Sequence, residues 1–149
     1  IGYHELFEVV TITATSHADD VCGVLSKKLP AQARIVDAAI VADTLAAENV
    51  GAIALHIHSS DVAIDAAKQG TEIIGADTAG DASLPDADLD ISSDANAGAV
   101  VTYGTLAAQA RGTDETFFLL ANQDDISTIS NSPKVGVYIK WFGPAAVAK

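Results

Sequence analysis

The sequence predicts an all-β fold: an antiparallel β-sandwich or jelly-roll-like domain with at most one short helix near residues 62–69. Seven or eight short segments alternate apolar and polar residues, which is typical of strands with one buried face. Turn-forming residues separate these segments, and only one stretch has a helical pattern. At 149 residues, the chain can bury a core without disulfides or a structural metal. We expect a single domain, residues 8–149, after an N-terminal arm, residues 1–7.

Four strands are predicted in the first half of the chain. They cover residues 4–15, 21–29, 34–43 and 51–58. In the first of them, Leu6 and Val10 share one face, while Phe7 and Val9 lie on the other. The second strand ends before Pro30, because proline cannot donate a hydrogen bond to a neighbouring strand.

The third and fourth strands each have one apolar face. The expected members of these faces are Val36, Ala38, Ile40 and Ala42 in the third strand, and Ile53, Leu55 and Ile57 in the fourth. Since side chains alternate along a strand, Ala54, His56 and His58 should point outward from the fourth strand.

Residues 51–75 have two interpretations. Asp61 is suited to cap a helix over residues 62–69, and Gly70 stands where a helix usually stops. Together with a strand over residues 71–75, this would make a βαβ unit. However, the helix has barely two turns, which is shorter than the ~10–12 residues that a parallel crossover spends. We therefore interpret residues 62–69 as a connection between strands of a sheet.

Three further strands are expected in the second half, at residues 99–105, 115–121 and 134–142. Residues 75–97 are rich in Ala, Ser, Gly and Asp, as in a solvated loop, with room for one edge strand. The aromatic residues gather near the two ends of the chain. They are Tyr3 and Phe7 near the start, and Phe117, Phe118, Tyr138, Trp141 and Phe142 near the end, with Tyr103 between. The first and last strands are therefore predicted to share a core region.

Acidic residues outnumber basic ones by 20 to 8, which gives a net charge of −12. Binding of nucleic acid depends on Lys and Arg side chains that neutralise phosphates, so this charge excludes a nucleic-acid partner. No apolar run approaches the ~20 residues of a membrane span, so we expect a soluble protein. The acidity is regional, because no Lys or Arg occurs between Lys68 and Arg111. Seven acids lie in that gap: Glu72, Asp77, Asp81, Asp86, Asp88, Asp90 and Asp94.

Two polar clusters have some features of metal sites. His56 and His58 form an H-x-H pair, which resembles the metal motif of cupins but lacks the Glu that follows in that family. Asp86, Asp88 and Asp90 resemble a calcium loop but lack its glycine and its final glutamate. We interpret both clusters as solvated surface and predict no metal site and no cofactor.

No catalytic motif is found. The sequence has no nucleophile elbow, phosphate-binding glycine loop or H-E-x-x-H helix. The single Cys22 is flanked by apolar residues and is expected to be a buried thiol. A sugar-binding platform is disfavoured, because Trp141 has the opposite parity to Tyr138 and Phe142. We therefore predict that the chain is not an enzyme and has no catalytic residues.

A resemblance to a known family is carried by residues 28–40. They read Lys-Leu-Pro-Ala-Gln-Ala-Arg-Ile-Val-Asp-Ala-Ala-Ile: an apolar residue and proline, a turn of small residues, a β-branched pair and an Ala-rich strand. The chain also has an N-terminal strand or arm, a middle segment at residues 52–57, an acidic variable region, residues 113–120 and a closing strand at residues 134–142. This pattern resembles small structural proteins of tailed bacteriophages.

The resemblance implies a capsid decoration (cement) protein. Such a protein binds the outer surface of the major capsid protein lattice as a dimer or trimer, stabilises the capsid, assembles in the host cytoplasm and ends in the virion. Partner contacts through strand addition are expected from the arm residues Ile1, Tyr3, His4, Leu6 and Phe7. The acidic region would face solvent, and the lattice contact would lie on the less acidic remainder.

Two alternatives remain at this stage. One is a carbohydrate-binding or receptor-binding β-sandwich of a virion spike or tail. The other is a small α/β enzyme or ligand-binding domain that uses residues 51–75.

Overall fold

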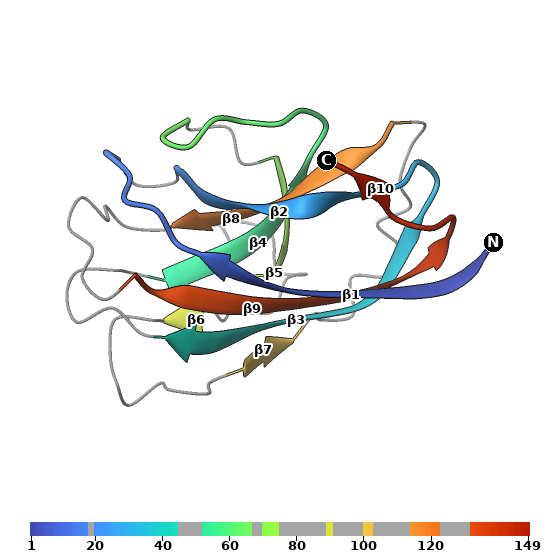
Figure 1. Cartoon of the computed structure of the whole chain (residues 1–149), viewed down its shortest axis with the longest axis horizontal. Helices are drawn as coiled ribbons and strands as arrows, with labels where there is room; N and C mark the ends of the chain where they lie inside the picture. The colour runs from blue at the N-terminus through green and yellow to red at the C-terminus, as the bar shows by residue number, and fades with distance from the viewer. Residues whose placement is uncertain are drawn as a thin grey trace, which may run out of the picture.

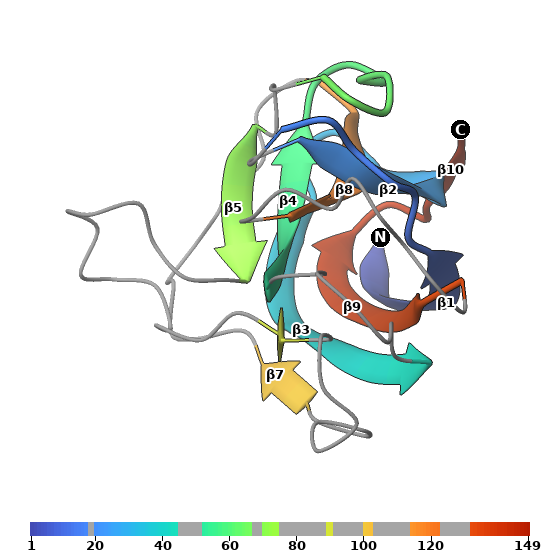
Figure 2. The same ribbon diagram turned by 90° about the vertical axis from the view of Figure 1, so that its left-hand side faces the viewer.

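The computed structural model consists of two antiparallel β-sheets that pack face to face (Figure 1, Figure 2), which confirms the predicted β-sandwich. It describes residues 1–17, 20–44, 52–66, 70–74, 89–90, 100–102, 114–122 and 132–149. None of these described residues is helical, and hence none belongs to a helix able to cross a membrane.

The described strands occur in the predicted order, except that the last one, Val147–Ala148, was not predicted. They are β1 (Gly2–Thr11), β2 (Val21–Leu29), β3 (Arg34–Thr44), β4 (Ala52–His58), β5 (Thr71–Ile74), β6 (Leu89–Asp90), β7 (Val100–Thr102), β8 (Thr116–Asn122), β9 (Lys134–Gly143) and β10 (Val147–Ala148). The largest change of bounds is in β1, which begins and ends earlier than the predicted residues 4–15.

The first sheet has the strand order β1-β9-β3-β7. Its longest pairing joins the two ends of the chain: β1 lies antiparallel to β9 over ten successive residue pairs, from Gly2 opposite Gly143 to Thr11 opposite Lys134. Figure 1 shows these two strands, blue and red, side by side. The prediction that the first and last strands share a region of the fold is confirmed.

The second sheet has the order β10-β2-β8-β4-β5, and β6 also pairs with β4. The chain passes from the first sheet to the second directly after β1. Ile12 N–H still donates to Pro133 O at 2.8 Å beside β9, whereas Thr13 N–H donates to Cys22 O at 2.8 Å on β2. These two successive bonds close one corner of the sandwich.

The main core fills the space between the sheets. Its largest fully buried side chains are Trp141, Phe118, Leu25, Leu29, Ile40, Ile53, Leu55, Ile57 and Ile73. Each of these side chains stabilises the fold by roughly 1.5–3 kcal/mol through loss of apolar surface to water. The inward face of β1 follows the even-numbered residues, and Leu6 packs against this core while Val10 is part of it.

A second, smaller apolar cluster covers the outer face of the second sheet. Residues 61–66 fold back over β2 and β8, so that Val62 packs with Val21 and Leu119. Asp65 N–H donates to Val21 O at 3.4 Å. The prediction that Ala54 and His56 lie on the surface is wrong, because both are buried. The helix allowed near residues 62–69 is not formed at residues 62–66, and residues 67–69 lie outside the described residues.

The predicted inward face of β3 is wrong at one position. Val36 is exposed, whereas its neighbour Ile35 is buried. A register shift between Ile35 and Asp37 in the pairing with β9 explains the difference, since an extra residue in a strand reverses the parity on one side of it. Ala38 and Ile40 are buried as predicted.

Candidate interaction surface

The outer face of the first sheet carries exposed aromatic side chains. Because the even-numbered residues of β1 point inward, Tyr3, Phe7 and Val9 point outward. Their partners in the register with β9 are Phe142, Tyr138 and Gly136. The exposed fractions are 68% for Tyr3, 63% for Phe7 and 45% for Phe142. We call the set Tyr3, Phe7, Val9, Tyr138 and Phe142 the aromatic face.

The rings of the aromatic face contact one another across β1 and β9. Tyr3 and Phe142 lie edge to face, with ring centroids 5.2 Å apart. Phe7 lies over Gly136, where a Cβ atom would be 3.4 Å from its ring and 2.7 Å from Val41 Cγ1. Only glycine leaves this space free, because any other residue would add a Cβ atom there. Gly136 therefore makes room for the Phe7 ring and the Val41 side chain on this face of β9.

Charged groups border the aromatic face and are close to balanced. Lys140 stands opposite Glu5 on one side and Asp37 on the other, and its Nζ lies 5.3 Å from the centroid of the Tyr3 ring. Tyr138 Oη–H donates to Glu5 Oε1 at 3.1 Å. Desolvation, this hydrogen bond and the negative charges of Glu5 and Asp37 raise the pKa of Tyr138.

The charged residues that the described register places on this outer face are of both signs. They are Arg34, Lys134 and Lys140 with Glu5 and Asp37. Asp43, at the second register shift of β3, is not counted, because its side chain lies outside what the structure describes.

The five predicted arm residues fall into two groups. Residues 2–7 belong to β1 and pair with β9, so they form part of the sheet. Ile1, Tyr3 and Phe7 are exposed. His4 instead stacks on Trp141 with ring centroids 5.7 Å apart, and Leu6 packs against the core.

Trp141 is buried, with only 1% of its surface exposed, and its Nε1–H donates to Pro144 O at 2.8 Å. It cannot form an exposed platform, as its parity predicted. The aromatic face itself was not predicted. The sequence does show that Tyr138 and Phe142 lie on the same side of their strand. That they share a face with Tyr3 and Phe7 follows only from the pairing of β1 with β9.

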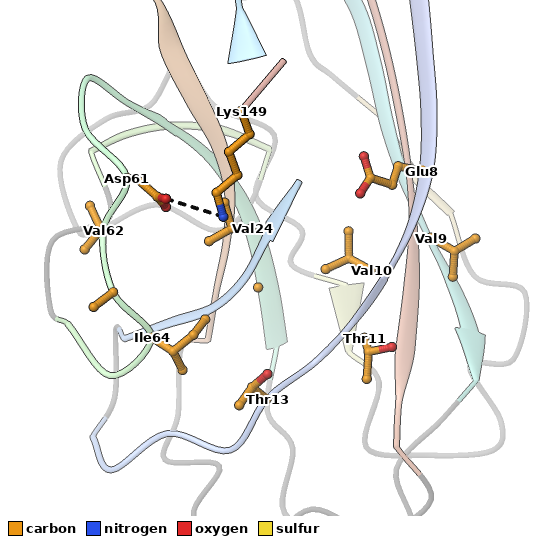
Figure 3. Close-up of a pocket in the computed structure, with 12 residues that line it drawn as sticks. Glu8, Val9, Val10, Thr11, Thr13, Val24, Asp61, Val62, Ile64 and Lys149 are labelled. Carbon is orange, nitrogen blue, oxygen red and sulfur yellow. Dashed lines mark ion pairs between the residues drawn. The ribbon is translucent and has the colours of Figure 1, made fainter. Parts of the chain in front are cut away.

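A groove of about 630 Å³ lies between β1 and residues 61–64, above β2 (Figure 3). Its charged groups are paired within the chain. Lys149 Nζ lies 3.4 Å from Asp61 Oδ2, and the Glu8 carboxylate accepts hydrogen bonds from Ser26 N at 3.0 Å and Ser26 Oγ at 2.8 Å. Both carboxylates that line the groove are therefore engaged within the chain.

The predicted polar clusters are placed as follows. Burial lowers the pKa of His56 to about 4, partly opposed by a hydrogen bond with the Gly70 backbone. His58 Nδ1 accepts a hydrogen bond from Ser60 N–H at 3.1 Å. Within the part of the chain that the structure describes, no three His, Cys, Asp or Glu residues gather as a metal site. Asp86 and Asp88 lie outside the described residues, and Asp90 belongs to β6.

Cys22 is fully buried, as predicted. Its Sγ–H donates to Leu120 O at 3.3 Å. Desolvation raises its pKa far above that of a free thiol, which keeps it protonated and unreactive as a nucleophile.

No protein-family model matches this sequence, and no curated protein matches it. Among solved structures, a chain from the capsid of Ralstonia phage GP4 is similar to this one, with a TM-score of 0.55 and 16% identity over 96% of this chain and 85% of that one. At this identity the likeness shows a shared fold.

Weaker similarity is found in two other capsid structures. The chain from the capsid of Helicobacter pylori bacteriophage KHP30 has a TM-score of 0.46 and 12% identity, over 99% of this chain and 92% of that one. The chain from the cyanophage Pam1 capsid has a TM-score of 0.41 and 17% identity, over 96% and 83%.

Proposed function

We propose that this chain is a non-enzymatic structural protein of a tailed-bacteriophage virion, which binds the outer surface of the major capsid protein lattice and stabilises the capsid as a decoration (cement) protein. The observation that carries the proposal is the exposed aromatic face on a fold shared with a chain of the GP4 capsid. The same fold serves many functions, so the argument for the function depends on the surface.

The aromatic face has the properties of a protein contact. At ~200 Å² for each fully exposed aromatic residue, Tyr3, Phe7 and Phe142 together leave about 350 Å² of residue surface in water. The largest apolar patch of a soluble protein often has a function, and aromatic residues are enriched in interfaces. Lys140 and Glu5 border this face with opposite charges, which limits the repulsion between an acidic molecule and another protein at this face.

The side chains proposed to bind the lattice are those of Ile1, Tyr3 and Phe7, together with Phe142. His4 and Leu6 would not contact the lattice themselves. They hold β1 in place from its inward side, His4 by stacking on Trp141 and Leu6 by packing against the core. Contact through the face of β1 also leaves its ten pairs with β9 intact, whereas donation of residues 1–7 to a neighbour would break them.

The environment of the reactive groups supports a non-enzymatic function. The Cys22 thiol and the His56 imidazole are both buried, and the carboxylates of Glu8 and Asp61 in the groove are engaged with Ser26 and Lys149. A general base needs access to a substrate within hydrogen-bond reach. The buried Cys22 and His56 lack that access, and the two groove carboxylates are already engaged with Ser26 and Lys149.

Rebinding to capsids tests the proposal. Purified protein is added to expanded capsids of the encoding phage that lack it, and the bound fraction and the temperature of capsid disruption are measured. We expect stoichiometric binding and a higher disruption temperature. Phe7→Glu should abolish both effects, whereas Ser59→Glu, which adds the same charge at an exposed position on the other side, should preserve them. Wild-type protein that neither binds nor protects the capsids contradicts the proposal.

A further inference from the structure

We infer that the free edge of β1 accepts an extended segment of another protein, which adds to the first sheet as a further strand. The segment expected is free of acidic residues, rich in β-branched residues and flanked by Lys or Arg. The inference does not depend on the proposed function, since it concerns the backbone edge of β1 rather than the side chains of the aromatic face.

The direction of the backbone groups in β1 follows from its register. Ile12 N–H donates to Pro133 O in continuation of the β1–β9 pairs, so even-numbered residues direct their N–H and C=O groups toward β9. Odd-numbered residues direct theirs to the free edge, and Thr13 already uses this direction to bond Cys22. Five odd-numbered residues remain: Tyr3, Glu5, Phe7, Val9 and Thr11. Within the described ranges, no other strand is hydrogen-bonded to this edge, and all five residues are exposed.

This edge has few of the features that usually protect edge strands. Natural edges are blunted by shortness, bulges, proline, lysine or other charged side chains. Of these, β1 has only the charges of Glu5 and Glu8, and the Glu8 carboxylate is already held by Ser26. Among the described strands, the other edges are short: β5 has 4 residues, β7 has 3 and β10 has 2. By contrast, β1 has 10 residues, no register shift against β9, and neither proline nor lysine. An open edge of this kind is a template for strand addition.

The groove extends this edge at its C-terminal end. Val9 and Thr11 of β1 form one side of it, Gly23 and Val24 of β2 lie below, and residues 62–64 form the opposite wall (Figure 3). At ~3.4 Å per residue, the edge from Tyr3 to Thr11 accommodates about nine residues of an added strand. The added strand would end in this groove of about 630 Å³.

The charges along the edge determine the chemistry of the segment. Three acids, Glu5, Glu8 and Asp61, border it. The two cations are Lys149, which is paired with Asp61, and Lys140, which lies opposite Glu5. This acidic majority disfavours a segment with Asp or Glu and favours Lys or Arg at its ends. Tyr3, Phe7 and Val9 lie beside the added strand on the outer side, where aromatic and β-branched residues make favourable cross-strand pairs.

A labelled peptide tests the inference. The probe is Lys-Val-Thr-Val-Thr-Val-Thr-Val-Lys, with a matched peptide that has Glu at both ends, and binding is measured by fluorescence anisotropy. The variant is Val9→Pro, which removes an N–H that faces the free edge and leaves the bonds to β9 in place. Val9→Thr is the control, because it keeps that N–H. We expect binding by the wild type and Val9→Thr, and about tenfold weaker binding by Val9→Pro and of the Glu-ended peptide.

Amide hydrogen exchange on the wild type gives a second readout that does not depend on folding of the variant. The Lys-ended peptide should slow exchange at Tyr3, Glu5, Phe7, Val9 and Thr11, while the even-numbered amides of β1 are already protected by β9. Unchanged exchange at these five amides overturns the inference. A dimer that forms in the protein alone and is lost in Val9→Pro also overturns the inference, because a second copy of this chain would then occupy the edge.

Discussion

The outer faces of the two sheets differ in what covers them. On the second sheet, residues 61–66 fold back over apolar side chains and bury Val21 and Leu119. On the first sheet, nothing among the described residues covers Tyr3, Phe7 and Phe142. Both faces carry apolar side chains, and within the described ranges the chain covers those of the second sheet. The covered face contributes to folding, whereas the exposed apolar face of the first sheet is the one that we propose for contact with another molecule.

The largest expected effect concerns the covered face. Leu119→Ala should lower the free energy of unfolding by about 2–5 kcal/mol, because it leaves a cavity between β8 and the covering segment. Urea denaturation at neutral pH measures this loss.

Leu119→Met is the matched control, since it conserves volume and should cost less than about 1.5 kcal/mol. A loss below 1 kcal/mol in the alanine variant would mean that residues 61–66 do not seal this face, and the contrast between the two faces would fail.

The second prediction concerns pH and His56 on the covered side. Burial holds the pKa of His56 near 4 in the folded protein, below the ordinary 6.5. The unfolded chain therefore binds more protons between these values, so stability should fall as pH decreases through that window. The contribution of this one group from pH 7 to pH 4 is about 3 kcal/mol.

Titration of carboxylates also changes stability in this range, so the measurement compares the wild type with His56→Leu at both pH values. The variant should lose less stability than the wild type on acidification. Parallel pH profiles for the two proteins would show that His56 is protonated in the folded state, and would contradict its tight burial.

Much of the fold could be predicted from local patterns, and the reasons are visible in particular residues. Pro30 ends β2 where it should, because proline has no N–H to donate. The alternation in β1 and β9 identifies their inward faces, since it reports the period of a strand directly.

The failures arise where one strand meets another part of the chain. The alternation in β3 does not reveal the shift at Val36, which depends on pairing with β9. His56 has the pattern of a surface residue but is buried, and its partner on β8, Leu119, lies under the segment that covers the second sheet. Likewise, Tyr3 and Phe142 lie at opposite ends of the chain, and only the β1–β9 register brings their rings within 5.2 Å. The aromatic face is therefore a tertiary feature.

The smallest effect on stability is expected on the uncovered face. Phe7 is 63% exposed, so most of its ring is in water in the folded as well as the unfolded state. Phe7→Ala should change the free energy of unfolding by only about 0.5 kcal/mol, whereas the matched Phe118→Ala in the core should cost about 3–5 kcal/mol. Urea denaturation compares the two variants. If Phe7→Ala costs as much as Phe118→Ala, the ring is part of the structural core and the aromatic face is not free for a partner. If Phe7→Ala keeps nearly all of its stability but no longer binds capsids, the Phe7 side chain serves contact with the partner and not folding.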